Sequence, residues 1–137
     1  MTKELKYFEG IGRRKEASAR VRISVDGVET KGVFIVNKMP YVNYFKVMDY
    51  QSTAYSPLKS LGTEAKKVKI EGRVIGGGPR GQAEAIRLGL ARAIVKWNPE
   101  LKAEMRSHGY LTRDARIVER KKYGLRKARR AQQWRKR

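Results

Sequence analysis

The stretch KVKIEGRVIGGGPRGQAEAIRLGLARAIVKW, residues 67–97, decides the fold of this chain. Over residues 67–75 apolar side chains alternate with charged ones, and this period of two predicts a half-buried β-strand. A glycine-rich loop at 76–81 follows directly, and apolar residues then recur over 81–97 with the period of a helix that packs on a sheet. A strand joined by a tight loop to an amphipathic helix predicts an α+β domain.

The predicted helix over 81–97 has one apolar and one charged face. We expect Arg92 and Lys96 to lie opposite the sheet, in solvent. An Asn-Pro pair ends this helix, and a second helix is expected from about residue 100 to residue 107, before Gly109 stops it. The apolar face is formed by Ile86, Leu90, Ala93, Ile94 and Trp97.

Three further strands are predicted on the N-terminal side of this unit. Residues 7–13 and 17–25 form the first two, and in the second of them apolar residues alternate with arginines, which gives that strand one basic, solvated face. A turn at Asp26-Gly27 leads into residues 28–37, where an apolar run predicts the third strand. The residues therefore predict a four-stranded sheet and two main helices.

The segment from 38 to 62 has a weaker pattern. Pro40 is expected to open a short helix, and Pro57 and Gly62 are expected to break whatever follows. The aromatic residues after Pro40 could stack on bases, but aromatic residues at such spacing more often belong to a core. We assign no chemistry to this segment.

Positive charge dominates the composition and is concentrated at the end of the chain. The sequence contains 33 Lys or Arg and 13 Asp or Glu, a net charge of +20. Residues 113–137 hold twelve of the basic and two of the acidic residues, with too few apolar side chains to build a core. We therefore expect a globular domain at 1–112 and an extended basic tail at 113–137 that is ordered on a polyanion. Nucleic acid is the expected partner.

The composition argues against most other functions. There are no cysteines, and the single histidine, His108, leaves no set of partners for metal or triad chemistry. We expect no catalytic residues, no metal site, no cofactor, no small-molecule substrate and no enzyme activity. The N-terminus has no apolar signal region, and no apolar run approaches the ~18 residues of a membrane span. A soluble intracellular protein without a membrane partner is expected.

The loop at 76–81 formally matches the dinucleotide-binding fingerprint. However, the preceding strand is not continuously apolar, Pro79 removes a backbone donor, and no later strand could deliver an acid to a ribose. Nucleotide binding is therefore disfavoured. The start of the helix could still hold a phosphate, including one of an RNA backbone, with help from Arg80. A tight turn alone explains the glycines equally well.

Two groups of cations are candidate phosphate contacts. Arg13, Arg14 and Lys15 lie at the turn between the first two strands, where solubility is the alternative explanation. In the tail, arginines can grip phosphates with two hydrogen bonds or lie flat on bases, and Tyr123 and Trp134 can stack.

Three segments carry a resemblance to a known family: YFEGIGRRKEASARVRI at 7–23, GGGPRGQAEAIRLGLARAI at 76–94 and LTRDARIVERKKYGLRKARRAQQWRKR at 111–137. Together they closely resemble the ninth protein of the small ribosomal subunit, bacterial type, over nearly the whole chain. The resemblance implies a mixed four-stranded sheet with helices on one face, like the second domain of ribosomal protein S-five. The strands and helices predicted from the residues agree with this fold.

The resemblance also implies a structural role in the head of the small ribosomal subunit, in the cytoplasm. The domain would bind the 3′ major domain of 16S ribosomal RNA beside neighbouring head proteins, and Lys136 and Arg137 would contact the peptidyl-site tRNA. Residues 132–135 depart from the family pattern, which leaves the path of residues 131–135 open. The expected rRNA contacts are Arg13, Arg14, Lys15, Arg80, Arg113, Arg116, Arg120, Lys121, Lys122, Arg126, Lys127, Arg129 and Arg130.

Two rival functions stay open. A nucleoid-type DNA-binding protein would carry the same charge, and it would prefer duplex DNA without regard to RNA folding. A small nucleotide-binding enzyme built on the glycine loop would bind NAD or ATP.

Overall fold

The computed structural model describes residues 7–25 and 32–135. Five strands form one mixed sheet in the order β1-β2-β5-β3-β4, in which β3 and β5 are parallel and the other neighbours are antiparallel. The strands are β1 (Tyr7–Arg14), β2 (Ala17–Ser24), β3 (Phe34–Val36), β4 (Met39–Pro40) and β5 (Lys69–Ile75). The predicted α+β fold with a mixed sheet is confirmed, and the sheet has one strand more than expected.

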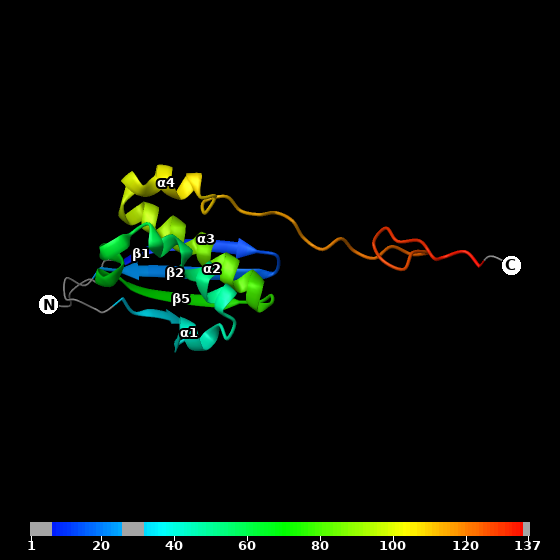
Figure 1. Ribbon diagram of the computed structural model, residues 1–137, viewed down its shortest axis with the longest axis horizontal. Helices are drawn as coiled ribbons and strands as arrows, with labels where there is room; N and C mark the ends of the chain where they lie inside the picture. Colours follow the sequence, from blue (N-terminus) through cyan, green and yellow to red (C-terminus); the bar gives the residue numbers. More distant parts are fainter. Residues whose placement is uncertain (1–6, 26–31, 136–137) are drawn as a thin grey trace.

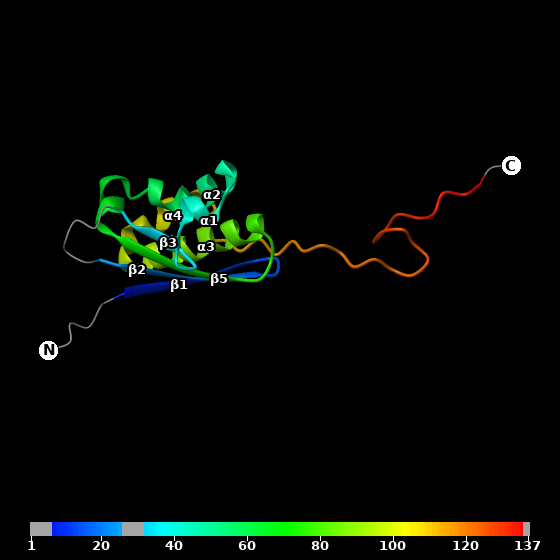
Figure 2. The same cartoon turned by 90° about the horizontal axis from the view of Figure 1, so that it is seen from below.

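The helices all cover the same face of the sheet, as the edge-on view shows (Figure 2). They are α1 (Tyr41–Tyr44), α2 (Met48–Lys59), α3 (Pro79–Trp97) and α4 (Lys102–Ser107), with short 3₁₀ segments η1 (Gly62–Lys67) and η2 (Pro99–Leu101). No helix formed by the described residues covers the opposite face of β1, β2 and β5 (Figure 2). This one-sided arrangement leaves the alternate side chains of three strands in solvent.

The extra strand, β4, follows a two-residue turn at Asn37 and Lys38. Both residues have positive φ angles, 48° and 68°, which is the geometry of a type I′ hairpin turn. The sequence pattern missed this strand because β4 is only two residues long and ends in Pro40. The third predicted strand, 28–37, is shorter than expected at Phe34–Val36, while its first residues and the Asp26-Gly27 turn lie outside the described part of the chain.

The core lies between the sheet and α3. In β2 the side chains of Ala17, Ala19, Val21 and Ile23 are all buried, which confirms the predicted alternation. In β1 the inward positions are Gly10 and Gly12, and a Cβ on either would overlap the backbone of α3 at Gly89 or Ala85. These glycines let the backbone of α3 lie closer to the strand than a side chain at either position would allow.

The prediction that Pro57 breaks its segment is wrong, because Pro57 lies inside α2 and is buried. A proline ring leaves the carbonyl four residues earlier without its usual amide donor. Here that carbonyl belongs to Thr53, and the Ser56 hydroxyl donates to it at 2.8 Å. Since the proline also sits in the last turn, only a short stretch of helix follows it.

Arg92 and Lys96 are exposed, as predicted, but the prediction that they lie opposite the sheet is wrong. Arg92 donates to the carbonyl of Ile11 and Lys96 to that of Glu9, each at 2.7 Å. Strand β1 is an edge of the sheet, so its outer carbonyls have no neighbouring strand to pair with. Because α3 runs along this edge, its cations supply the missing donors while remaining exposed.

The predicted ends of the last helices are confirmed. Asn98 caps η2 by accepting from the amide of Glu100 at 3.1 Å. After α4, Gly109 takes a φ of 73°, and the amide of Tyr110 donates to the Met105 carbonyl at 3.0 Å, which closes the helix. The predicted apolar stripe of α3 is buried apart from Trp97, which is partly exposed. Beyond α4 the chain leaves the body and runs far from it (Figure 1).

Candidate nucleic-acid interface

The uncovered face of the sheet is rich in arginine. Arg20 of β2 lies directly opposite Arg73 of β5, and Arg22 lies between Glu9 of β1 and Glu71 of β5. The alternation that buries the small and apolar residues of β2 therefore places its arginines on the solvent side. The basic face predicted for this strand is confirmed, although Arg20 and Arg22 were not named as site residues.

Acidic residues on this face organise the arginines and neutralise only part of their charge. Glu9 accepts from the Nε atoms of Arg20 and Arg22, each at 2.8 Å. The hydrogen bond from Arg20, followed by that from Arg22, holds the pKa of Glu9 below its ordinary value, so this carboxylate stays ionised. Glu71 pairs with Lys69 at 2.7 Å. Arg73 has no ion-pair partner within the described ranges 7–25 and 32–135.

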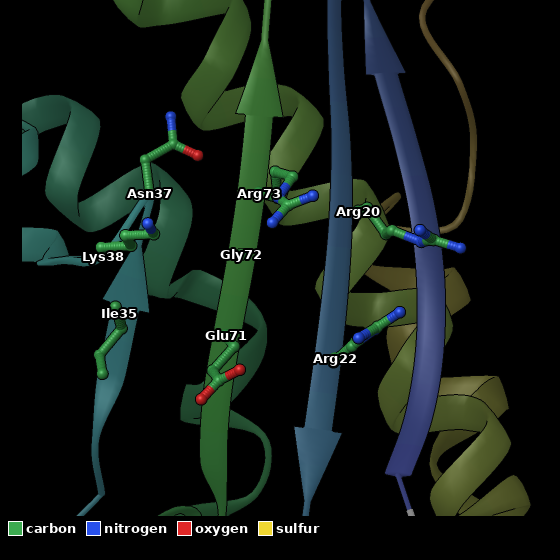
Figure 3. Close-up of a pocket in the computed structure, with 8 residues that line it drawn as sticks. All are labelled: Arg20, Arg22, Ile35, Asn37, Lys38, Glu71, Gly72 and Arg73. Carbon is green, nitrogen blue, oxygen red and sulfur yellow. The ribbon is translucent and has the colours of Figure 1, made fainter.

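A hollow of about 570 Å³ opens on this face between β2, β5 and β3 (Figure 3). Figure 3 shows Arg73 between β5 and β2 and Lys38 at the end of β3, while Arg20 and Arg22 extend from β2 toward β1. Its lining is Arg20, Arg22, Ile35, Asn37, Lys38, Glu71, Gly72 and Arg73. Four cations and one carboxylate on a pleated, open surface suit phosphate groups of an extended polyanion.

The turn that carries Lys38 is fixed by the side chain of Asn37. Asn37 Oδ1 accepts from the amide of Val74 at 2.9 Å, and its Nδ2 donates to the carbonyl of the same residue at 3.0 Å. The side chain thus pairs with β5 as a strand would, beyond the point where β3 ends. Non-glycine residues with positive φ often mark functional positions, and here the turn places Lys38 at the rim of the hollow. This contribution could not be found from sequence, since no local signal marks it.

The glycine loop forms a tight connection between β5 and α3. Gly76 and Gly77 have φ angles of 75° and 68°, and a Cβ on either would collide with the backbone around Glu16 and Ala17. The turn itself therefore requires both glycines. No strand follows α3 in the part of the chain that the structure describes, so a dinucleotide-binding βαβ unit is absent there. Phosphate binding by Arg80 and the start of α3 stays a prediction.

Arg14 occupies a different environment from its neighbours Arg13 and Lys15, which are exposed at the β1–β2 turn. Only 8% of Arg14 is exposed. Its Nε donates to Glu84 of α3, its Nη2 lies 3.2 Å from Asp114 Oδ2, and its Nη1 donates to the Arg116 carbonyl at 2.6 Å. The guanidinium therefore joins β1, α3 and the first residues of the tail.

Both carboxylates of this cluster are held ionised. Burial acts to raise the pKa of Glu84, but the hydrogen bond and charge of Arg14 outweigh it and lower that pKa. The pKa of Asp114 lies well below its usual range, mainly because the side chain and backbone of Arg116 donate to it. Arg80 approaches Glu84 at 3.4 Å. Three arginines that were predicted as RNA contacts, Arg14, Arg80 and Arg116, thus belong to one intramolecular network of ion pairs.

The tail has no core of its own. Tyr123, Val118 and Trp134 are almost fully exposed, and Ile117 is 70% exposed. Within the tail, residues 119–130 form a loop instead of continuing straight (Figure 1). Glu119 closes this loop through Lys122 at 2.6 Å and Arg129 at 3.0 Å.

Most predicted contacts lie on accessible surface. Lys136 and Arg137 lie outside the described residues. The exposed predicted cations of the tail are Arg113, Arg116, Arg120, Lys121, Lys122, Arg126, Lys127, Arg129 and Arg130. Among the described residues, no group of three or more His, Cys, Asp or Glu could hold a metal ion, and no helix is long and apolar enough to cross a membrane.

A small α+β body with a basic open sheet face, continued by an exposed basic tail, defines a class of protein that presents cations to a large polyanion. Comparison with known proteins then gives the family. The chain belongs to the ribosomal protein S9/S16 family, whose model matches residues 12–137. The resemblance seen in the sequence is confirmed.

Similar proteins span the full length of this chain. It is 48% identical to small ribosomal subunit protein uS9c of Gracilaria tenuistipitata var. liui, covering 100% of this chain and 98% of that protein. It is 48% identical to uS9 of Cytophaga hutchinsonii, covering 97% and 100%. It is 47% identical to uS9 of Crocosphaera subtropica, covering 98% and 96%.

Proposed function

We propose that this protein is a structural constituent of the small ribosomal subunit and not an enzyme. In this proposal it lies in the head of the subunit, in cytoplasmic ribosomes, where it binds the 3′ major domain of 16S rRNA and touches neighbouring head proteins. The observation that carries the proposal is the pairing of the open arginine-lined sheet face with the exposed tail. Membership of the ribosomal protein S9/S16 family and the names of the similar proteins support it.

The two surfaces would act on RNA in different ways. On the sheet face, Glu9 fixes the direction of Arg20 and Arg22, so these guanidinium groups are positioned before RNA arrives. Fixed cations can match one arrangement of phosphates, which selects a folded RNA shape. The tail carries its cations on exposed backbone, so it gains affinity mainly by releasing counterions from whatever phosphates it reaches.

The tail also supports a contact with tRNA. In the proposal, Lys136 and Arg137 bind phosphates of the peptidyl-site tRNA. Phosphate contacts carry no base information, so different tRNAs would be held alike. Removing the last two residues should weaken tRNA binding to the peptidyl site while small subunits still assemble. Equal subunit yield together with unchanged tRNA affinity would contradict this part of the proposal.

A titration against two polyanions tests the main proposal. The full chain is mixed with folded 16S 3′-domain RNA and, separately, with duplex DNA of equal charge, over a range of salt concentrations. We expect the RNA complex to survive salt that dissociates the DNA complex, because fixed arginines add a shape-dependent term to the salt-dependent one. If both affinities fall together along one steep line, the nucleoid-type alternative is favoured instead.

A further inference from the structure

We propose that Arg14 is a positioning residue that anchors the tail to the body and sets the direction in which the tail leaves it. The proposal rests on the proposed function only where it concerns RNA affinity. It changes the role predicted for Arg14 from the sequence, which was a phosphate contact. The cluster of Arg14, Glu84, Asp114 and Arg116, here called the tail anchor, carries the inference.

Arg14 already has a partner at each of its three guanidinium nitrogens. Its guanidinium reaches a carboxylate of α3, a carboxylate of the tail and a backbone carbonyl of the tail. To bind an RNA phosphate, Arg14 would have to leave two carboxylates, one of which is itself partly buried. Abandoning a buried carboxylate costs more than an exposed phosphate contact returns.

The charged groups that contact the Arg14 guanidinium are both carboxylates. Glu84 and Asp114 both stay ionised next to the guanidinium. Arg13, one residue earlier, is exposed on the other side of the strand and has no ion-pair partner among the described residues. The alternation of the strand therefore divides two adjacent arginines into an outward cation and an inward anchor.

The tail anchor holds the start of the tail against the body. From Ile117 onward, the tail is exposed and makes no described contact with the body. The anchor at 114–116 is therefore the last point that fixes the chain relative to α3 and the sheet. Ordering the backbone there before RNA binds removes part of the entropy cost of binding, and it raises the local concentration of the tail near RNA already held by the body.

The experiment uses the full-length chain and four single variants. Arg14→Gln removes the anchor from the body side, and Arg13→Gln removes the same charge from the neighbouring exposed arginine. Asp114→Asn removes the tail side and leaves the pair between Arg14 and Glu84 in place. Glu16→Gln, at the adjacent turn, makes the same charge change as Asp114→Asn without touching the anchor.

Two quantities are measured for each variant. Backbone order of residues 115–118 is measured by NMR relaxation in the free protein, and RNA affinity is measured against salt. We expect Arg14→Gln and Asp114→Asn to lower this order and to weaken RNA binding about three- to tenfold, with the same salt slope as the natural chain. Arg13→Gln and Glu16→Gln should leave the order unchanged.

The change in RNA affinity of Asp114→Asn discriminates best, because this variant makes the chain more basic. Charge alone predicts RNA binding that is equal or tighter, and such a result overturns the proposal. It is also overturned if Arg14→Gln lowers the salt slope by about 0.7 to 0.9, the value for one lost phosphate contact. The NMR arm needs no RNA, so it decides the anchor even if the proposed rRNA binding fails. If Arg14→Gln does not fold, Asp114→Asn still tests whether the anchor orders the tail.

Discussion

The body and the tail carry the same net charge, +10 each, but they hold it in different ways. In the body, carboxylates such as Glu9 and Glu84 sit between pairs of arginines and fix their directions. In the tail, most cations stand on exposed backbone with no apolar packing below them. Equal charge therefore gives a surface of oriented cations in one region and a series of exposed cations in the other.

This difference teaches that net charge does not by itself determine the kind of RNA recognition. A patterned surface depends on the sheet register, so any change that disturbs the fold should disturb it. A tail depends mainly on the number of cations and on where it is attached. Changes in the body should therefore affect mainly the free energy of unfolding. Changes in the tail should affect mainly the salt dependence of RNA binding.

The largest expected effect comes from removing the tail beyond its anchor. A chain that ends at Val118 keeps Asp114 and Arg116 but loses ten cations. We expect RNA affinity near 0.1 M salt to fall on the order of a thousandfold, with a shallower salt slope, because several phosphate contacts are lost. The free energy of unfolding of the body should change by less than about 0.5 kcal/mol. A large loss of stability would show that the two regions are not separate.

Gly12→Ala in β1 is expected to change the stability of the body. A Cβ at this position would overlap the carbonyl of Ala85, so α3 would have to move away from the sheet. We expect the free energy of unfolding to fall by about 3 kcal/mol, as measured by chemical denaturation. Gly78→Ala is the matched control, because a Cβ there meets nothing within 4 Å and its φ is −98°. It should cost less than about 1 kcal/mol.

A smaller effect is expected from Arg73→Gln on the open face. This arginine lines the hollow without an ion-pair partner in the described part of the chain, so its charge is available to RNA. We expect affinity for folded 3′-domain RNA to fall about five- to tenfold, with the free energy of unfolding unchanged within about 0.5 kcal/mol. Arg106→Gln, an equal loss of charge on α4, should have less effect. Equal losses for the two variants would argue that the open face has no special role.

The elements of the body could largely be predicted from the sequence, because they follow periodic patterns. The strand at 67–75, the helix after the glycine loop and the buried alternation in β2 all depend on one face meeting a core. Pro57 could not be placed, because its tolerance in α2 depends on the Ser56 hydroxyl reaching a particular carbonyl. Edge contacts such as that of Lys96 depend on which strand lies outermost, and no local pattern contains that information.

The site was predicted less completely, for a related reason. Counting cations identified the tail, where position matters little, but it did not distinguish Arg13 from Arg14 in chemical role. That distinction needs the partners on α3 and in the tail, which are 70 and 100 residues away in the chain. Lys38 was missed because a hairpin turn places it at the hollow, and the turn is stabilised by Asn37 acting on a distant strand.

The smallest expected effect is in the pH dependence of the body. The pKa of Glu9 is lowered in the folded state by hydrogen bonds from Arg20 and Arg22. A lowered pKa means that this carboxylate contributes stability above its unfolded pKa, near 4.5, and that the contribution is lost as pH falls through the folded value. Glu9→Gln should therefore lower the free energy of unfolding at pH 7 by less than about 1 kcal/mol, since the pair is solvent-accessible, and the difference from the natural chain should shrink as pH falls below about 4.5.

The same acid titration separates body from tail. The pKa of Asp114 is also lowered, but its carboxylate holds the tail and lies outside the core of the body. Acidification should therefore loosen residues 115–118, followed by NMR, without a matching step in the unfolding of the body, followed by circular dichroism. The loosening should begin as pH falls below about 3.8, the ordinary pKa of this carboxyl, and should be complete only well below it, because the anchor lowers the pKa of Asp114. If the two signals change together at every pH, the tail is part of the folded unit, and the contrast between a patterned body and an independently moving tail is wrong.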